Sequence, residues 1–484
     1  MRFDGFIGGS YQSQAATADS ERTINWYVEN MEVPSATVQK ALYPTPGVTL
    51  LADAGDGVGR AHFAMADREF AVIGDFFWEI DSDGSLISRG SLFAGGNDPS
   101  TTPATINSNG DVGGQLFITA SNHGFVYDLS TNLLNRITAL DGKATMGGYL
   151  DGYFLALDVA ASILYISALG DGATWSTGTD FTQRSLAADP WKSFIVAGRY
   201  IFLYGEQTTE IWLDVGARFP FAPIPSAMLN YGIAAPWSAA VVGDTAVWLA
   251  TNEGGRLCVM QASGVNPQAI STHPLELAIQ GYSDYPDAIA DSYSDQGHTF
   301  YMLNFDASGV THAWDAMTGL WGERGTWQPL IQAYETWRPR FHAYSAQQHR
   351  MLDRGGSGVY HMDTSLTTDV DGLAIRRLRR APVPMAENKR VLYSLFELDL
   401  EPGLGTSGQG EDPQVMFRMS NDGGKTWGTE QMRGAGKTGE YGKRVRWHRL
   451  GNARRRVFEV SVTDPIPWRL TGAYLTARAA EAAA

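Results

Sequence analysis

One pattern of hydrophobic and polar positions recurs along most of the chain. A short apolar run is followed by a turn rich in Gly, Asn or Asp, and then by a second apolar run that is usually centred on an aromatic residue. The second runs are centred on Trp78, Tyr127, Tyr165, Trp212, Val259, Trp314 and Tyr360, at spacings of 38 to 55 residues that average 47. A degenerate strand repeat of about 40–50 residues is typical of a β-propeller with about four strands per blade.

The runs that precede these centres supply partner strands for the same blades. Glu69–Ile73 comes before Gly74–Asp75 and the first centre, and Gln115–Thr119 occupies the same place in the second repeat. Because one blade cannot bury both of its faces, blades must stack around an axis. We therefore predict seven blades between about residues 50 and 366, or six if a weak copy is irregular. Two packed β-sandwiches are the alternative.

The fold class predicted is all-β, a six- or seven-bladed β-propeller with a C-terminal β-sandwich-like domain. The 54 glycines and the lack of long Ala/Leu/Glu/Lys runs agree with many short strands joined by tight turns. The predicted divisions are an N-terminal extended arm (1–48), the propeller (49–366), a linker (367–390) that contains Arg376–Arg380, a C-terminal β domain with basic strands (391–476) and a flexible tail (477–484).

Charge is distributed unevenly along the chain. The net charge is −15, but residues 371–484 carry 19 Lys and Arg against 13 Asp and Glu, whereas residues 1–370 carry 18 against 39. An acidic body therefore carries a basic C-terminal part. Such an asymmetry often marks an interaction surface, although two ordinary solvated faces would give the same counts.

The basic residues concentrate between Tyr441 and Leu475. Arg444, Arg446 and Arg449 alternate with apolar residues at nearly the period of a strand, and three more arginines precede a second alternating run. We predict an interface at this run, because arginine is favoured where carboxylates are paired bidentately. The predicted interface residues are Arg444, Arg446, Trp447, Arg449, Arg454, Arg455 and Arg456. Direct contact of this patch with DNA is the competing interpretation.

A hairpin motif lies just before the arginine run. Residues 420–427 read S-N-D-G-G-K-T-W and match the Asp-box, in which an Asp and a Gly hold a turn and a Trp packs beneath it. The predicted Asp-box residues are Ser420, Asp422, Gly424, Thr426 and Trp427. The motif is a folding element that is common in sialidases and other propellers, so it does not predict a glycosidase.

Catalytic and cofactor motifs are missing from the sequence. It holds no P-loop, dinucleotide fingerprint, H-E-x-x-H or G-x-S-x-G pattern. Cys258 is the single cysteine and lies in an apolar run, which excludes an intramolecular disulfide and indicates a small buried residue. We predict no catalytic residue, cofactor or metal site, and no signal peptide or membrane anchor, because no apolar run reaches about 18 residues.

The C-terminal segment resembles the packaged-DNA stabilisation proteins of short-tailed bacteriophages, also called tail nozzle or hub proteins. The resemblance is specific over about 70 residues and more diffuse in earlier stretches. It is carried by Asp412–Val415, Ser420–Trp427, Glu430–Met432, Glu440–Val445, Trp447–Gly451, Arg454–Val462 and Leu470–Leu475, with weaker similarity in Tyr43–Thr49, Trp191–Trp212 and Tyr231–Ala235.

This resemblance implies a structural protein of the virion tail that is made and assembled in the bacterial cytoplasm. It implies a propeller subunit of a ring, a homohexamer, below the portal and its adaptor. The ring would extend the DNA exit channel, retain packaged DNA until ejection, let genomic DNA pass without sequence-specific binding, and anchor a tail needle or fibres. The alternative function is a carbohydrate-binding propeller, such as a lectin or receptor-binding module, and an enzyme with an unrecognised site is a third.

Overall fold

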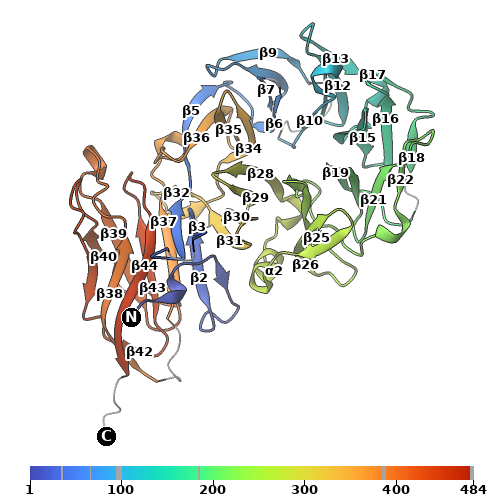
Figure 1. Ribbon diagram of the computed structural model, residues 1–484. Coiled ribbons are helices and arrows are strands. Elements are labelled where there is room, and N and C mark those ends of the chain that lie inside the picture. The colour runs from blue at the N-terminus through green and yellow to red at the C-terminus, as the bar shows by residue number, and fades with distance from the viewer. Residues whose placement is uncertain (34–35, 66, 94–100, 184–185, 384–388, 480–484) are drawn as a thin grey trace.

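The chain forms a seven-bladed β-propeller with a β-sandwich beside it (Figure 1). The structure is a computed structural model that describes residues 1–33, 36–65, 67–93, 101–183, 186–383 and 389–479. The predicted all-β fold class is confirmed. The number of blades is seven rather than six.

Each blade is an antiparallel sheet built on four strands. Blade one consists of β6 (Gly59–Met65), β7 (Arg68–Ile73), β8 (Phe76–Ile80) and β9 (Leu86–Ser91). Blade two consists of β10 (Thr105–Ser108), β11 (Gln115–Ala120), β12 (His123–Asp128) and β13 (Leu133–Ile137). Blade three consists of β14 (Met146–Leu150), β15 (Tyr153–Asp158) and β16 (Ile163–Ala168), with β17 (Asp171–Trp175) and β18 (Phe181–Gln183) paired to β16. Blades four and five are β19 (Ser193–Ala197), β20 (Tyr200–Tyr204), β21 (Thr209–Asp214) and β22 (Phe221–Pro223); and β23 (Gly232–Ile233) and β24 (Ala240–Val242) with β25 (Thr245–Thr251), β26 (Leu257–Ser263) and β27 (Asn266–Ala269). Blades six and seven are β28 (Ile289–Asp295), β29 (His298–Phe305), β30 (Val310–Asp315) and β31 (Leu320–Arg324); and β34 (Pro339–Ser345), β35 (Gln348–Asp353), β36 (Gly358–Asp363) and β5 (Gly47–Asp53).

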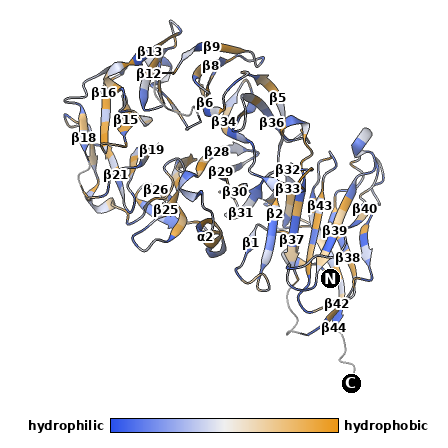
Figure 2. Cartoon of the chain, turned by 180° about the vertical axis from the view of Figure 1, so that it is seen from behind, coloured by the Kyte–Doolittle hydropathy of each residue, from blue (hydrophilic) through white to orange (hydrophobic). Residues whose placement is uncertain are grey.

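The repeat that is visible in the sequence corresponds to one strand of each blade. All seven centres of the repeat lie in the third strand of a blade, namely β8, β12, β16, β21, β26, β30 and β36. The second strands of the blades are buried almost throughout, as the five consecutive buried residues of β7 and of β11 show. A half-exposed sheet would instead alternate buried and exposed residues. Burial on both faces follows from stacking between two neighbouring blades. Figure 2 shows hydrophobic stretches in orange along the blade strands.

A separate hydrophobic cluster fills each of the seven gaps between neighbouring blades. Phe70 and Phe77 of blade one meet Tyr127 of blade two in one cluster, and Leu352 of blade seven meets Ile73 of blade one in another. Cys258 lies in the cluster between blades four and five, where burial raises the pKa of its thiol to about 11. The propeller core is therefore a circle of interfaces rather than one central core.

The circle is closed by a strand from the N-terminal side of the chain. β5 is the fourth strand of blade seven, paired antiparallel with β36, so that Leu50 lies opposite Tyr360. Val48 of this strand is buried against Met362 and Met351. Residues 47–53 thus join the last blade to the first part of the chain.

The sandwich consists of two sheets with one hydrophobic core between them. One sheet extends the sheet of blade six and consists of β2 (Ser20–Ile24), β37 (Arg377–Pro382), β43 (Val457–Val462), β39 (Gln414–Ser420) and β40 (Gln431–Gly434), with β1 (Tyr11–Gln12) paired to β2. The other is β3 (Trp26–Asn30), β4 (Lys40–Pro44), β44 (Leu470–Ala479), β38 (Val391–Leu400) and β41 (Val445–His448), with β42 (Asn452–Ala453) on β38. Phe396, Phe417 and Phe458 lie at the centre of the shared core.

The flanks of the propeller differ from the sequence prediction. The predicted arm at 1–48 forms strands of the sandwich, and the predicted linker at 367–390 contains β37, while its residues 384–388 lie outside the described residues. Residues 477–479 of the predicted tail belong to β44, and 480–484 lie outside the described residues. Both segments look polar in the sequence because they carry charged residues, such as Glu21 and Arg379, which pair with each other in the fold.

The remaining elements are short. They are the hairpin β32 (Thr326–Gln328) and β33 (Ala333–Glu335), the α-helices α1 (Gly110–Gly113) and α2 (His273–Gln280), and the 3-10 helices at Asp4–Phe6, Thr138–Leu140, Pro225–Ala227, Tyr285–Asp287, Val370–Gly372 and Gly408–Gly410. No helix in the described part of the chain is long and apolar enough to cross a membrane.

Candidate functional site

The Asp-box at 420–427 has the turn geometry that its sequence predicts. The carboxylate of Asp422 accepts the backbone N–H groups of Lys425 and Thr426, both at 2.9 Å, and the hydroxyl of Thr426 at 2.6 Å. The Ser420 hydroxyl donates to Asp422 at 2.6 Å and accepts the N–H of Gly424, whose φ is +98°. The hydrogen bonds from Ser420 and Thr426 hold the pKa of Asp422 well below its usual range.

The ring of Trp427 contacts two arginines. The guanidinium carbons of Arg380 and Arg418 each lie 4.7 Å from the centre of its ring. Both arginines also pair with Glu459, at 2.7 Å and 2.5 Å, and the Glu459 side chain is 1% exposed. The Asp-box therefore positions an aromatic wall for a charged cluster that spans β37, β39 and β43.

The structure separates the predicted interface residues into three groups. Arg444 and Arg446 are engaged by one carboxylate, since Glu397 accepts from Arg444 at 2.5 and 2.8 Å and lies 3.1 Å from Arg446 Nε. Arg449, Arg454 and Arg455 are exposed and form no ion pair with any residue that the structure describes. These three therefore present guanidinium groups to solvent without a paired carboxylate among the described residues.

Trp447 and Arg456 are core residues, and their prediction as interface residues is wrong. Trp447 is fully buried and stacks on Phe417 with ring centres 4.6 Å apart. Arg456 is 1% exposed, lies 4.9 Å over the ring of Tyr393 and donates to the carbonyl of Leu450 at 2.8 Å. The arginine run turns inward at Arg456 because β43 begins at the next residue.

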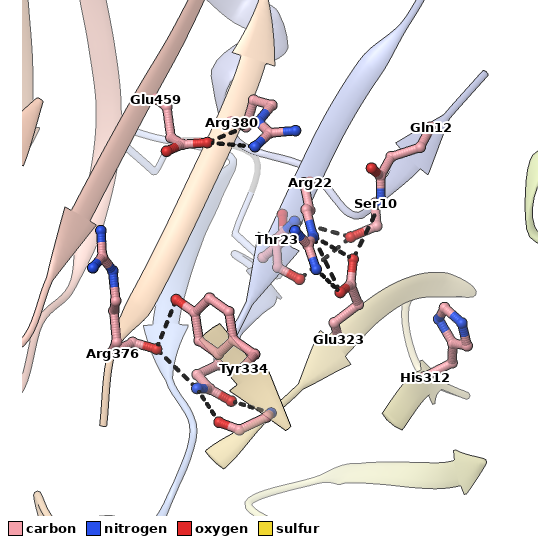
Figure 3. Close-up of polar contacts among 12 residues, drawn as sticks. Ser10, Gln12, Arg22, Thr23, His312, Glu323, Tyr334, Arg376, Arg380 and Glu459 are labelled. Atoms are coloured by element: carbon pink, nitrogen blue, oxygen red, sulfur yellow. Dashed lines mark hydrogen bonds and ion pairs between the residues drawn. The ribbon is translucent and has the colours of Figure 1, made fainter. Parts of the chain in front are cut away.

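A second charged region, at the junction of the propeller and the sandwich, was missed from the sequence. Arg22 on β2 forms two parallel hydrogen bonds to Glu323 on β31, at 2.9 and 2.7 Å (Figure 3). Burial alone would raise the pKa of Glu323, but Arg22 outweighs burial and holds it below its ordinary value. At the same point β2 pairs parallel with β31, so that the sheet of blade six continues into the sandwich.

Backbone contacts reinforce this junction. The side chain of Asn25 donates to the carbonyls of Gly325 and Arg376, at 2.9 and 2.8 Å. The Tyr334 hydroxyl, from the β32–β33 hairpin, also donates to the carbonyl of Arg376, at 3.4 Å (Figure 3). Residues from three distant parts of the chain therefore converge on one carbonyl.

β37 distributes its arginines over two faces. Arg377 and Arg379 are 1% and 0% exposed, and Arg379 donates to the carbonyls of Phe6 and Gly9 at 2.6 and 2.7 Å. Arg376 and Arg380 point to the opposite side, as the period of two requires. The Arg376–Arg380 cluster is thus a strand of the sandwich and not a charged linker.

The axis of the propeller encloses a small channel that both polar and apolar residues line. Its volume is about 390 Å³, and the innermost strands line it with residues such as Phe194, Val196, Trp237 and Phe341. That volume is typical of a small-molecule pocket. Among the described residues, no three His, Cys, Asp or Glu side chains gather as they would around a metal ion.

Both domains match one protein family. The family described as bacteriophage P22 Gp10, beta-propeller, matches residues 9–367, and that described as bacteriophage P22 Gp10, beta-sandwich, matches residues 376–478. The chain belongs to the bacteriophage P22 Gp10 family. This family of phage tail stabilisation proteins is the one that the C-terminal motifs resemble, so that resemblance is confirmed. The chain is therefore a structural component of a phage virion tail.

Solved structures match this Gp10-family chain at low identity and low TM-score. The N-terminal domain of Nup159 is 9% identical, with a TM-score of 0.39 over 71% of this chain and 99% of that one. The Neurospora crassa Pan2 WD40 domain is 10% identical, with a TM-score of 0.38 over 66% and 94%. The BT4673 extracellular domain from B. thetaiotaomicron is 9% identical, with a TM-score of 0.42 over 69% and 46%. No curated protein matches the sequence.

Proposed function

We propose that this chain forms a ring, a homohexamer, below the portal and its adaptor in the phage tail. The ring extends the channel through which DNA leaves the capsid, retains the packaged DNA and anchors a tail needle or fibres. The observation that carries this proposal is the match of both domains to the Gp10 tail family. The protein acts here as a structural element, without catalysis, and joins the virion in the host cytoplasm.

The size of the propeller channel supports a DNA path between subunits. An opening of about 390 Å³ is too small for a duplex, whose major groove alone is about 12 Å wide. In a ring of several copies, the axis of the assembly carries the DNA instead. The acidic propeller suits this role, because a conduit that paired many Lys and Arg with phosphates would hold the duplex in place.

The exposed arginines at one end of the sandwich are proposed to contact a neighbouring copy or the adaptor. Arg449, Arg454 and Arg455 are available because no described carboxylate neutralises them, in contrast to Arg444 and Arg446. Arginine pairs carboxylates bidentately and is enriched at protein interfaces. An acidic partner surface is the chemistry that fits them.

Electron microscopy of the purified protein, alone and with portal–adaptor complexes, tests the proposal. We expect six-fold rings that attach to the distal end of the adaptor. A monodisperse monomer that does not bind these complexes would overturn the proposed ring. Binding to glycans on an array, with no ring, would instead favour a carbohydrate-binding propeller.

A further inference from the structure

A polar cleft of about 520 Å³ opens at the junction between the propeller and the sandwich. Its walls come from β2 and β31 on one side, the β32–β33 hairpin on another, and β37 and β39 of the sandwich. The cleft is thus built by segments that are far apart in the sequence. The contacts of Arg22, Asn25 and Tyr334 hold these walls together, so the cleft is preformed.

Arginines dominate the lining of this cleft in an otherwise acidic protein. Arg22, Arg324, Arg376, Arg380 and Arg418 line it, against the carboxylates of Glu323 and Glu430. The side chains of Arg22, Arg376, Arg380 and Arg418 keep 28%, 16%, 15% and 33% of their surface exposed. The cleft therefore presents an excess of positive charge on a chain with a net charge of −15.

Aromatic rings pack against the guanidinium groups of two of these arginines. The guanidinium carbon of Arg376 lies 4.3 Å from the centre of the Trp327 ring, which itself packs against Tyr334 at 4.9 Å. Arg418 is fixed in the same way by Trp427. A guanidinium fixed over an aromatic ring loses little further entropy when its free N–H groups bind an acceptor.

Arg376 keeps capacity for a ligand. Its nearest carboxylate is that of Glu430, at a loose 3.6 Å, and its Nε has no hydrogen-bond partner among the described residues. The nitrogen that faces Glu430, Nη2, also donates to the Ser461 hydroxyl at 3.0 Å. The side chain keeps 16% of its surface exposed, so an acceptor in the cleft can meet the guanidinium there.

We propose that this junction cleft binds an extended acidic peptide segment of a partner protein, with Asp or Glu carboxylates paired to Arg376 and Arg418. Carboxylates match the planar fork of arginine, and the Trp327 and Tyr334 rings offer apolar surface to the peptide between its charges. A peptide is favoured over nucleic acid because Glu323 and Glu430 line the same cleft and would repel a continuous row of phosphates. The isolated chain binds the peptide whether or not it forms a ring.

Fluorescence anisotropy with a labelled hexaglutamate peptide tests this site on the full chain. We expect binding at about 0.02 M salt that weakens toward 0.15 M. Arg376→Glu should weaken it about tenfold or more, since at least one charge-assisted pair is lost. Arg199→Glu, which makes the same charge change on an exposed residue of the β19–β20 turn outside the cleft, should leave it within about twofold.

Other outcomes would overturn the proposal. The cleft is not the site if the two variants weaken binding equally, because the effect would then be one of overall charge. A labelled oligothymidylate that binds in place of the peptide and is lost in Arg376→Glu would assign the cleft to nucleic acid. Wild-type protein that does not bind hexaglutamate would end the proposal. Trp327→Ala, which leaves all charges in place, gives a second measurement if Arg376→Glu fails to fold.

Discussion

Arg22 and Glu323, which lie 301 residues apart in the sequence, form a bidentate ion pair that joins the sandwich to blade six of the propeller. Glu323 is 6% exposed, while Arg22 keeps 28% of its side chain in contact with solvent at the edge of the cleft. The pair lies where β2 continues the sheet of the blade. It therefore fixes the relative position of the two domains.

Arg22→Ala is expected to destabilise the protein by about 3 kcal/mol, because it leaves a buried carboxylate without its partner. Chemical denaturation measures this change. Adding Glu323→Gln should recover part of the loss, since the unpaired charge is then removed. Lys437→Ala is the control, because the Lys437–Glu411 pair is 52% and 69% exposed and should contribute less than about 1 kcal/mol.

His298 predicts a pH dependence of the contact between β3 and blade six. Its Nδ1 lies 2.8 Å from a carboxylate oxygen of Asp315, and its Nε2 lies 3.1 Å from one of Glu29. Hydrogen bonds to Asp315 first and to Glu29 second raise the pKa of His298, although burial lowers it. A raised pKa gives stability that is complete below the ordinary pKa of histidine and is lost as the pH rises through the folded value.

Thermal unfolding of His298→Gln and wild type should therefore differ most near pH 6, and the difference should shrink toward pH 9. The exposed His448, changed to Gln, is the control and should show no such trend. A difference that stays constant across this range would contradict the assignment.

Trp447 and the exposed arginines should separate folding from assembly. Trp447→Ala removes a fully buried ring and should cost about 3–5 kcal/mol in unfolding experiments.

The triple change of Arg449, Arg454 and Arg455 to Ala should leave stability within about 0.5 kcal/mol per site but reduce ring formation or DNA retention. Normal particles with full genomes from the triple variant would contradict the proposed contact surface.

Asp422→Ala should destabilise the sandwich by about 1–2 kcal/mol, because the carboxylate accepts two backbone N–H groups and two hydroxyls in the Asp-box turn. Lys425→Ala, in the same turn, should have little effect. Loss of the cation–π contacts of Trp427 should accompany the change, and tryptophan fluorescence can follow it. Equal stability of the two variants would show that the turn is held by other contacts.

The periodicity of the sequence revealed the propeller because each blade must bury the same strands between its two neighbours. The third strand of every blade is buried on both faces, so Trp212 and Tyr360 recur in register although their surroundings differ. The Asp-box at Ser420–Trp427 was equally visible, since its hydrogen bonds run between residues at most four apart.

Pairing between distant segments was not visible in the sequence. The sequence places the stretch around Arg22 in an extended arm and the cluster Arg376–Arg380 in a linker, because a strand pattern does not identify the strand with which it pairs. Only the fold shows that these segments lie side by side, with Thr23 opposite Arg379. The same limitation placed Arg456 at the surface, since its inward turn depends on the ring of Tyr393 and the carbonyl of Leu450.

The closure of the last blade by β5 also dictates the order in which the molecule can be completed during synthesis. Val48 hydrogen-bonds with Thr368, 320 residues later, and Leu42 of β4 lies opposite Leu470 of β44. A ribosome that adds about 5–20 residues per second exposes the early strands long before either partner exists. The propeller cannot close until β36 has been made, and the sandwich cannot be completed until β44 has been made, so only completed chains present both domains in full.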